Sequence, residues 1–95
     1  MYARLTTYQC DAARLDELVA TLDDIRAEIK AIEGLVDVYS VWRADGHGCT
    51  VAIYQTQAAA EAATAQVQGI WAKVADVLVS PPDPQTYENV EHLTG

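Results

Sequence analysis

The sequence contains few positively charged residues. Lys and Arg together number 6, against 14 Asp and Glu, and the formal net charge is −8 at pH 7. Binding to a phosphate backbone depends on clustered cations that displace counterions, so this balance disfavours nucleic acid as a partner. It disfavours anionic membrane surfaces for the same reason. We therefore expect no nucleic acid and no membrane among the partners.

Long apolar runs and a targeting signal are also missing. No stretch approaches the roughly 20 apolar residues that a membrane-spanning helix needs. The start of the chain, MYARLTTYQC, alternates polar and apolar residues and lacks the basic segment and continuous apolar core of a signal peptide. These absences predict a cytoplasmic protein.

Cysteine is scarce, with only Cys10 and Cys49 in the chain. Two cysteines are too few for a disulfide scaffold, and their separation is unlike the paired spacing of zinc sites. We expect two reduced thiols. A disulfide between them is the alternative, because the two positions fall on strands that are predicted to be neighbours.

The rest of the composition is that of a folded protein. Hydrophobic residues make up 51% of the chain and charged residues 21%, a balance typical of globular domains rather than disordered segments. Ninety-five residues suit one domain with a modest core. We therefore predict a single domain over residues 1–95.

Two periodicities organise the first half of the chain. Residues 2–9 alternate and are rich in β-branched and aromatic side chains, which predicts a strand. From Leu15 to Ile32 apolar residues recur in alternating steps of three and four, which predicts an amphipathic helix. Asp11 is the expected N-cap of this helix, and Gly34 can adopt the left-handed conformation that ends it.

The middle of the chain predicts a β-hairpin. Residues 36–43 and 49–55 are rich in Val, Ile, Tyr and Trp, and the segment 45–48 between them has the residues of a turn. We interpret this hairpin as structural: its turn residues make the loop and its aromatic residues fill the sheet.

A second helix and a last strand complete the pattern. Residues 57–79 place apolar side chains on one helical stripe, with Gly69 as the expected weak point. The prolines of SPPDP, residues 80–84, cannot continue a helix. Residues 87–93 then predict a short strand.

The order βαββαβ is the ferredoxin-like α+β arrangement. Right-handed crossovers give a four-stranded antiparallel sheet in the order 4-1-3-2, with both helices on one face. The other face would expose an apolar patch larger than soluble monomers usually tolerate. A second copy related by two-fold symmetry would cover it, so we predict a homodimer. A polar, solvated face is the alternative, which Arg4, Thr6 and Gln55 leave open.

The strand directions predict a group of reactive side chains at one edge of the sheet: Tyr8, Cys10, His47, Cys49 and Tyr87. Cys10, His47 and Cys49 have the number of ligands that a catalytic zinc site takes. The His-x-Cys spacing is not a recognised zinc pattern, however, and a histidine between two glycines of a turn is more often solvated. We predict no metal site.

Several stretches carry a family resemblance: EGLVDVY after the first helix, WRADGHGCTVAIYQT in the hairpin, the alanine-rich second helix and YENVEHL in the tail. Together with the element order they resemble the dimeric α+β barrel proteins of the antibiotic biosynthesis monooxygenase type, over nearly the whole chain. The resemblance implies that the sheets of two protomers pack into a barrel. It also implies a pocket between each sheet and its helices that admits a small aromatic ligand.

Trp71 is the residue that we expect to wall such a pocket, because it flanks the apolar stripe of the second helix. Core packing is the other interpretation of its position. The remaining predicted pocket residues are Val67, Ala63, Ala59, Trp42 and Tyr54, and the alternative for Trp42 and Tyr54 is the inside of the dimer barrel. The small side chains at Ala59 and Ala63 leave space, and an apolar cavity with few polar groups is typical of sites for small aromatic molecules.

The resemblance leaves the activity open: some members of the family oxidise phenolic or quinol-type substrates with oxygen and no metal, flavin or other cofactor, others degrade haem with a pattern of Asn, Trp and His, and many have no known reaction. The cofactor-free oxidation needs a base and hydrogen-bond donors for the substrate anion. His92, on the predicted last strand near Arg4 or Tyr2, is our candidate base, and Trp71 is the second candidate catalytic residue. An interface contact is the alternative interpretation of His92. The second helix has no His and the first strand no Asn, so the haem-degrading pattern is broken. Two functions stay open: a cofactor-independent monooxygenase, and a non-catalytic protein that binds a small ligand or only dimerises.

Overall fold

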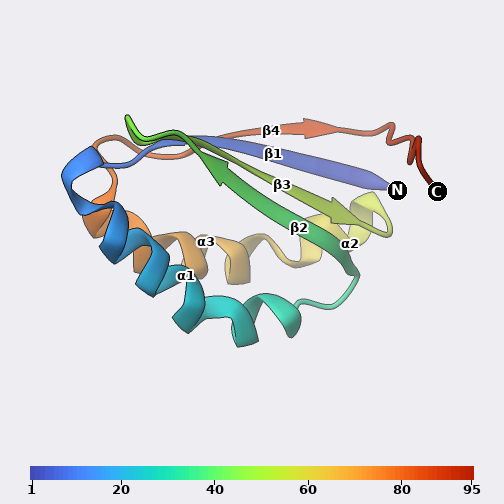
Figure 1. Cartoon of the computed structure of the whole chain (residues 1–95). Coiled ribbons are helices and arrows are strands. Elements are labelled where there is room, and N and C mark those ends of the chain that lie inside the picture. The colour runs from blue at the N-terminus through green and yellow to red at the C-terminus, as the bar shows by residue number, and fades with distance from the viewer.

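A computed structural model describes the whole chain, residues 1–95. The elements are β1 (Tyr2–Gln9), η1 (Ala12–Arg14), α1 (Leu15–Lys30), β2 (Leu35–Trp42), β3 (His47–Tyr54), α2 (Gln57–Ala62), α3 (Thr64–Val74), η2 (Ala75–Val77) and β4 (Asp83–Tyr87). The strands form one antiparallel sheet in the order β2-β3-β1-β4, and all helices lie beneath one of its faces (Figure 1). The predicted ferredoxin-like fold and strand order are confirmed. None of the helices combines the length and apolar character that crossing a lipid bilayer requires.

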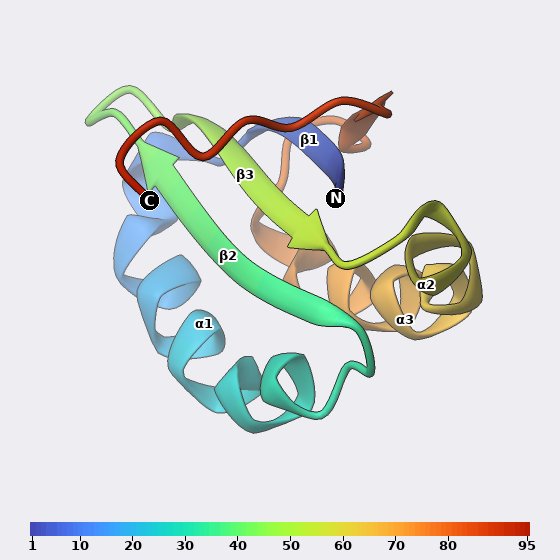
Figure 2. The ribbon, with the colours of Figure 1, turned by 90° about the vertical axis from the view of Figure 1, so that its right-hand side faces the viewer.

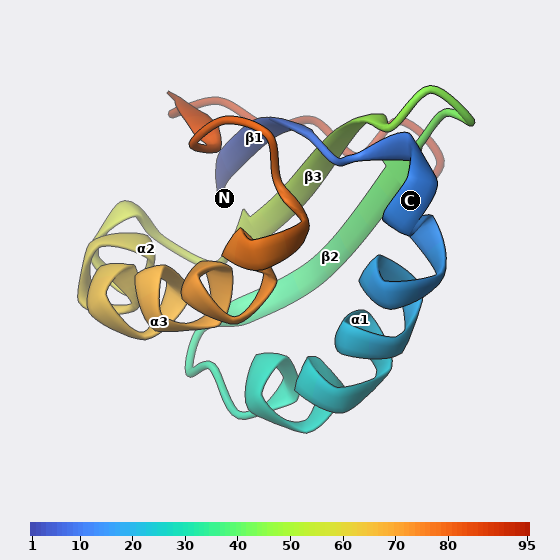
Figure 3. The same ribbon diagram turned by 90° about the vertical axis from the view of Figure 1, so that its left-hand side faces the viewer.

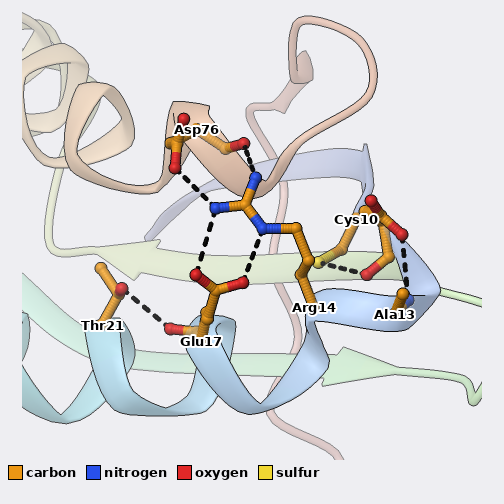
Figure 4. A network of polar contacts seen from close by, with 7 residues as sticks. Cys10, Ala13, Arg14, Glu17, Thr21 and Asp76 are labelled. Atoms are coloured by element: carbon orange, nitrogen blue, oxygen red, sulfur yellow. Dashed lines mark hydrogen bonds and ion pairs between the residues drawn. The ribbon is translucent and has the colours of Figure 1, made fainter.

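The start of α1 follows the expected capping. Asp11 Oδ1 accepts a hydrogen bond from the Ala13 amide at 2.9 Å, which caps the short η1 turn that leads into α1. Arg14 then links this end of α1 to η2: its Nε donates to Glu17 Oε2 and its Nη2 to Asp76 Oδ2, both at 2.6 Å (Figure 4). These ion pairs tie the two helical segments together at one end of the layer.

The second helix differs from its prediction. We expected one helix over 57–79 that loosens at Gly69, but the structure divides it at Ala63 into α2 and α3. Thr64 Oγ1 donates to the Ala60 carbonyl at 3.3 Å, a side-chain bond that competes with the helical backbone bonds and bends helices. Gly69 stays helical inside α3.

The position of the last strand was also predicted wrongly. We expected residues 87–93, but β4 is Asp83–Tyr87, with Tyr87 opposite Ala3 and Asp83 opposite Thr7. Pro84 is tolerated because β4 is an edge strand, where a missing N–H need not break the ladder. Residues 88–95 form no strand and run past the end of the sheet (Figure 1).

The core fills the space between the sheet and the helices, with α1 and α3 side by side beneath it (Figures 2 and 3). It consists of two clusters. The first comprises Ile25, Ile32, Tyr54, Ala60, Ala63 and Ile70, and the second Tyr8, Cys10, Leu18, Val74 and Val77. These clusters set the separation of sheet and helices, and thereby the space that is left between them.

Two glycines offer a test of the fold with opposite outcomes. Gly46 has a φ of +91°, and a Cβ there would lie 2.0 Å from the Cys10 carbonyl oxygen. Gly69 lies in α3 with nothing within 4 Å of such a Cβ. We expect Gly46→Ala to lower the free energy of unfolding by more than about 2 kcal/mol. Gly69→Ala should raise it by about 0.5–1 kcal/mol.

Urea unfolding of the two variants beside the wild type checks this pair. Equal effects of the two substitutions would contradict the backbone geometry described for the hairpin.

Candidate functional site

A cavity of about 740 Å³ lies between the helix-facing side of the sheet and helices α1 and α3, and 17 of its 24 lining residues are hydrophobic. This size is in the range of sites for small molecules, which are mostly apolar with a few polar groups that fix orientation. The polar groups on the sheet side come from β1, β2 and β3. They fall into two sets, one around Tyr8 and one around Arg4.

The first set depends on a glycine. Gly48 lies opposite Tyr8 in the β1–β3 pair, and a Cβ at Gly48 would lie 2.2 Å from the Tyr8 ring. Because that space is empty, the ring crosses β3 and its hydroxyl lies 2.9 Å from Ser40 Oγ on β2. Thr50 Oγ1 on β3 donates to the same Ser40 oxygen at 3.1 Å. A short chain of three hydroxyls thus stands in a mostly apolar cavity.

Trp71 of α3 packs against the ring of Tyr8, the first member of this chain of hydroxyls. Its ring centroid lies 5.7 Å from that of Tyr8, with the two planes at 57°, a tilted arrangement that aromatic pairs favour. A planar ligand placed against Trp71 would therefore have the Tyr8–Ser40 pair within reach of its polar substituents.

The second set lies further along β1. Arg4 Nη1 donates to the Tyr54 hydroxyl and Nη2 to the Ala60 carbonyl, both at 3.2 Å. The guanidinium carbon also lies 5.4 Å from the centroid of the Tyr54 ring, within the range of a cation–π contact. Arg4 is only partly buried and lines the cavity.

Burial raises the pKa of both cavity tyrosines above its ordinary value. Burial raises the pKa of Tyr8, although the hydrogen bond to Ser40 opposes this rise. Burial likewise raises the pKa of Tyr54, against the opposing positive charge of Arg4. At neutral pH these side chains are therefore hydrogen-bonding phenols, and a phenol with a raised pKa is a poor general base.

Four of the predicted pocket residues line the cavity: Trp42, Tyr54, Val67 and Trp71. The other two, Ala59 and Ala63, do not. Ala63 is buried in the first core cluster. Ala59 packs against the turn at Gly34: a Cβ added to Gly34 would lie 2.5 Å from the Cβ of Ala59. Ala59 and Ala63 therefore allow close packing of this helical segment against the turn at Gly34 and the core, and they do not open space for a ligand.

His92 lies outside the cavity. It was predicted on the last strand beside Arg4 or Tyr2, but it belongs to the exposed segment after β4. The prediction of its surroundings is wrong because β4 begins four residues earlier than expected. A role for His92 as a base at the cavity has no geometric support.

The predicted group of reactive side chains is only partly assembled. Cys10 and Tyr8 lie on the helix side, whereas Cys49 pairs with Thr7 and points to the opposite face. Both cysteines are free, and Cys10, His47 and Cys49 do not come together. Tyr87 lies at the other end of β1.

The sequence analysis did not identify Arg4, Ser40, Thr50 or Tyr8 as residues of the cavity. One signal was available, because the alternation of β1 places Arg4, Thr6 and Tyr8 on one face. We had left open that Arg4 and Thr6 make the uncovered face polar. They lie instead on the face that the helices cover.

The comparisons with known proteins support the fold. No family model and no curated protein match the sequence. Among solved structures, NE2512 of Nitrosomonas europaea, a protein of unknown function, has a TM-score of 0.80 at 15% identity, covering 96% of this chain and 90% of its own. A Caulobacter crescentus protein described as a candidate antibiotic biosynthesis monooxygenase has a TM-score of 0.78 at 16% identity, and the match covers 95% of this chain and 90% of that protein.

A Deinococcus radiodurans protein with the same description has a TM-score of 0.78 at 15% identity, covering 98% of this chain and 96% of its own. This chain has the fold of the antibiotic biosynthesis monooxygenase-type proteins. At such low identities the similarity establishes the fold alone, and the function has to be argued from the cavity.

The buried tyrosines predict how stability depends on pH. An unfolded tyrosine has a pKa of about 10, and the folded values of Tyr8 and Tyr54 are raised above it. Their contribution is thus full below about pH 10 and is lost as the pH rises through the folded values. We expect Tyr8→Phe to lose stability less steeply than the wild type over that alkaline range.

Urea unfolding at a series of pH values measures this slope. Tyr39→Phe is the matched control at a protein concentration where the chain is monomeric, since Tyr39 is 64% exposed on the single chain. A Tyr8→Phe slope equal to that of the wild type would contradict the buried, neutral state of Tyr8.

Proposed function

We propose that the protein binds a small phenolic or quinol-type aromatic molecule in the cavity between its sheet and its helices. The observation that carries this proposal is the Tyr8–Ser40–Thr50 hydroxyl chain beside Trp71, in a cavity whose wall is otherwise largely apolar. A phenolic oxygen can donate to and accept from these hydroxyls, while its ring packs against Trp71.

A cofactor-independent monooxygenase is the second candidate function. The fold similarity favours it, and so does the position of neutral donors where the oxygen of a substrate anion would lie. In such a reaction an activated ring CH₂ and O₂ give a ring C=O and water. The substrate must first lose a proton, and the only carboxylate on the cavity wall is Asp37, which is exposed. The geometry therefore supports binding more directly than proton abstraction.

We also propose that the protein acts as a homodimer through the sheet face that the helices leave open. The strand register places Leu5, Val51 and Ile53 in the centre of this face. Around them, Tyr39 is 64% exposed, Val41 61% and Tyr87 49%. A surface of this kind on a soluble protein marks an interaction site, and a second copy offers the same apolar surface.

Binding and catalysis can be tested with the same variants. We expect 2-naphthol to bind the wild type, and Trp71→Ala to weaken this binding about tenfold, because the aromatic wall is lost. His92→Ala is the matched control and should bind like the wild type. Calorimetric titration measures the affinities, and circular dichroism verifies that the variants fold.

Oxygen uptake with anthrone and 1,4-naphthohydroquinone then separates the two functions. Uptake above the uncatalysed rate that falls in Trp71→Ala supports the monooxygenase. Binding without uptake supports the non-catalytic protein, and absence of any binding rejects both.

The dimer is tested by substituting two exposed valines. Val41 lies on the open face of the sheet, and Val19 lies on α1 with 42% exposure. We expect light scattering to give twice the chain mass for the wild type and for Val19→Glu at micromolar concentration. Val41→Glu should give the mass of a single chain, because a buried unpaired carboxylate opposes association. A monomeric wild type would overturn the proposal.

A further inference from the structure

The cavity wall is positively charged although the protein as a whole is acidic. Three of the 6 positively charged residues of the chain line the cavity: Arg4, Arg26 and Lys30. Of the 14 acidic residues only Asp37 lines it. The wall thus carries three positive charges against one negative charge in a chain of net charge −8. A wall of one sign around a low-dielectric space concentrates ligands of the opposite sign.

Arg4 is the cation that lies on the cavity floor. None of the ion pairs in the structure includes it; its only partners are the neutral Tyr54 hydroxyl and the Ala60 carbonyl. A guanidinium has five N–H donors, so the two bonds to these partners leave three donors free. A partly buried positive charge without a carboxylate partner is costly, and an anionic ligand would relieve this cost.

The two cations contributed by α1 differ in their pairing. Arg26 Nε donates to Asp23 Oδ1 at 2.9 Å, and its side chain is 70% exposed, so its charge is largely compensated. Lys30 is exposed and has no ion pair. These residues can attract an anion, whereas Arg4 is placed to hold it.

The spacing of Arg4 and Tyr8 indicates the shape of the ligand. Four residues of strand separate their Cα atoms by about 13 Å, and both side chains lie on the helix-facing side. On the α3 side of this span the wall is apolar, with Trp71, Val67 and Ile70, while Thr6 lies between the two residues on β1. A two-ring aromatic body with one polar group at each end matches this arrangement.

We propose that the ligand of this cavity is a hydroxyaryl carboxylate. Its carboxylate binds the free donors of Arg4, its ring system packs against Trp71, and its hydroxyl joins the Tyr8–Ser40 pair. The planar fork of arginine matches a carboxylate in two parallel hydrogen bonds, which makes this the favoured anion. The proposal rests on the proposed function, since it specifies the ligand of the same cavity.

Calorimetric titration with three naphthalene probes tests it: 6-hydroxy-2-naphthoate has both groups, 2-naphthol lacks the carboxylate, and 2-naphthoate lacks the hydroxyl. We expect 6-hydroxy-2-naphthoate to bind the wild type about tenfold more tightly than 2-naphthol, because its carboxylate adds a charge-assisted hydrogen bond. Arg4→Gln should remove this preference, which is measured within each variant as the ratio of its affinities for 6-hydroxy-2-naphthoate and 2-naphthol. Arg4→Lys, which keeps the charge, should retain part of the preference.

Arg43→Gln is the matched control. It removes the same charge from the hairpin, outside the cavity wall, and should leave the preference intact. Equal binding of 6-hydroxy-2-naphthoate and 2-naphthol by the wild type would overturn the carboxylate proposal and leave the proposed function standing. Failure of all three probes would reject the proposed function and this proposal with it.

If Arg4→Gln does not fold, the salt dependence of binding to the wild type still tests the proposal. Its preference for the carboxylate must decrease as salt is added, because charge pairs near a surface are screened. A preference that salt does not change, or no preference at all, would overturn the role of Arg4.

Discussion

The passage of the Tyr8 ring across β3 is the contact on which the cavity depends. It is possible only because Gly48 offers no side chain at the point where the ring lies, 2.2 Å from where a Cβ would be. The ring then reaches a hydroxyl two strands away and meets Trp71 from the helical layer. The absence of a side chain at Gly48 thereby allows the single side chain of Tyr8 to link three strands and a helix. The same contact fixes the polar end of an otherwise apolar cavity.

The fold could be predicted because it follows from periodicity. Steps of three and four in α1, alternation in β1 and turn residues in the hairpin are local signals that the core reinforces. The end of the chain resisted prediction for an equally physical reason. The prolines of residues 80–84 were interpreted only as the end of the second helix, yet an edge strand tolerates Pro84, and β4 forms earlier than the apolar pattern suggested.

The cavity was predicted only in part. The large aromatic residues Trp42, Tyr54 and Trp71 were recognisable as candidates because bulky aromatic side chains on a sheet and its covering helix usually pack in a core, at a ligand or at an interface. Ala59 and Ala63 were misjudged, since a small side chain can mark empty space or close packing and the sequence does not distinguish these cases. Ser40 and Thr50 could not be found, because their importance arises from a contact across two strands.

The composition of β4 has a consequence for the edge of the sheet. A sheet ends in unpaired backbone groups that could recruit the strand of another molecule and lead to edge-to-edge aggregation. Along this border the chain has only five strand residues, all exposed, with a proline in second place and an aspartate in first. Such a border is a poor template for further strands. Growth of the sheet into a continuous ribbon is thereby disfavoured on that side, whereas the opposite edge, β2, has eight residues and no proline.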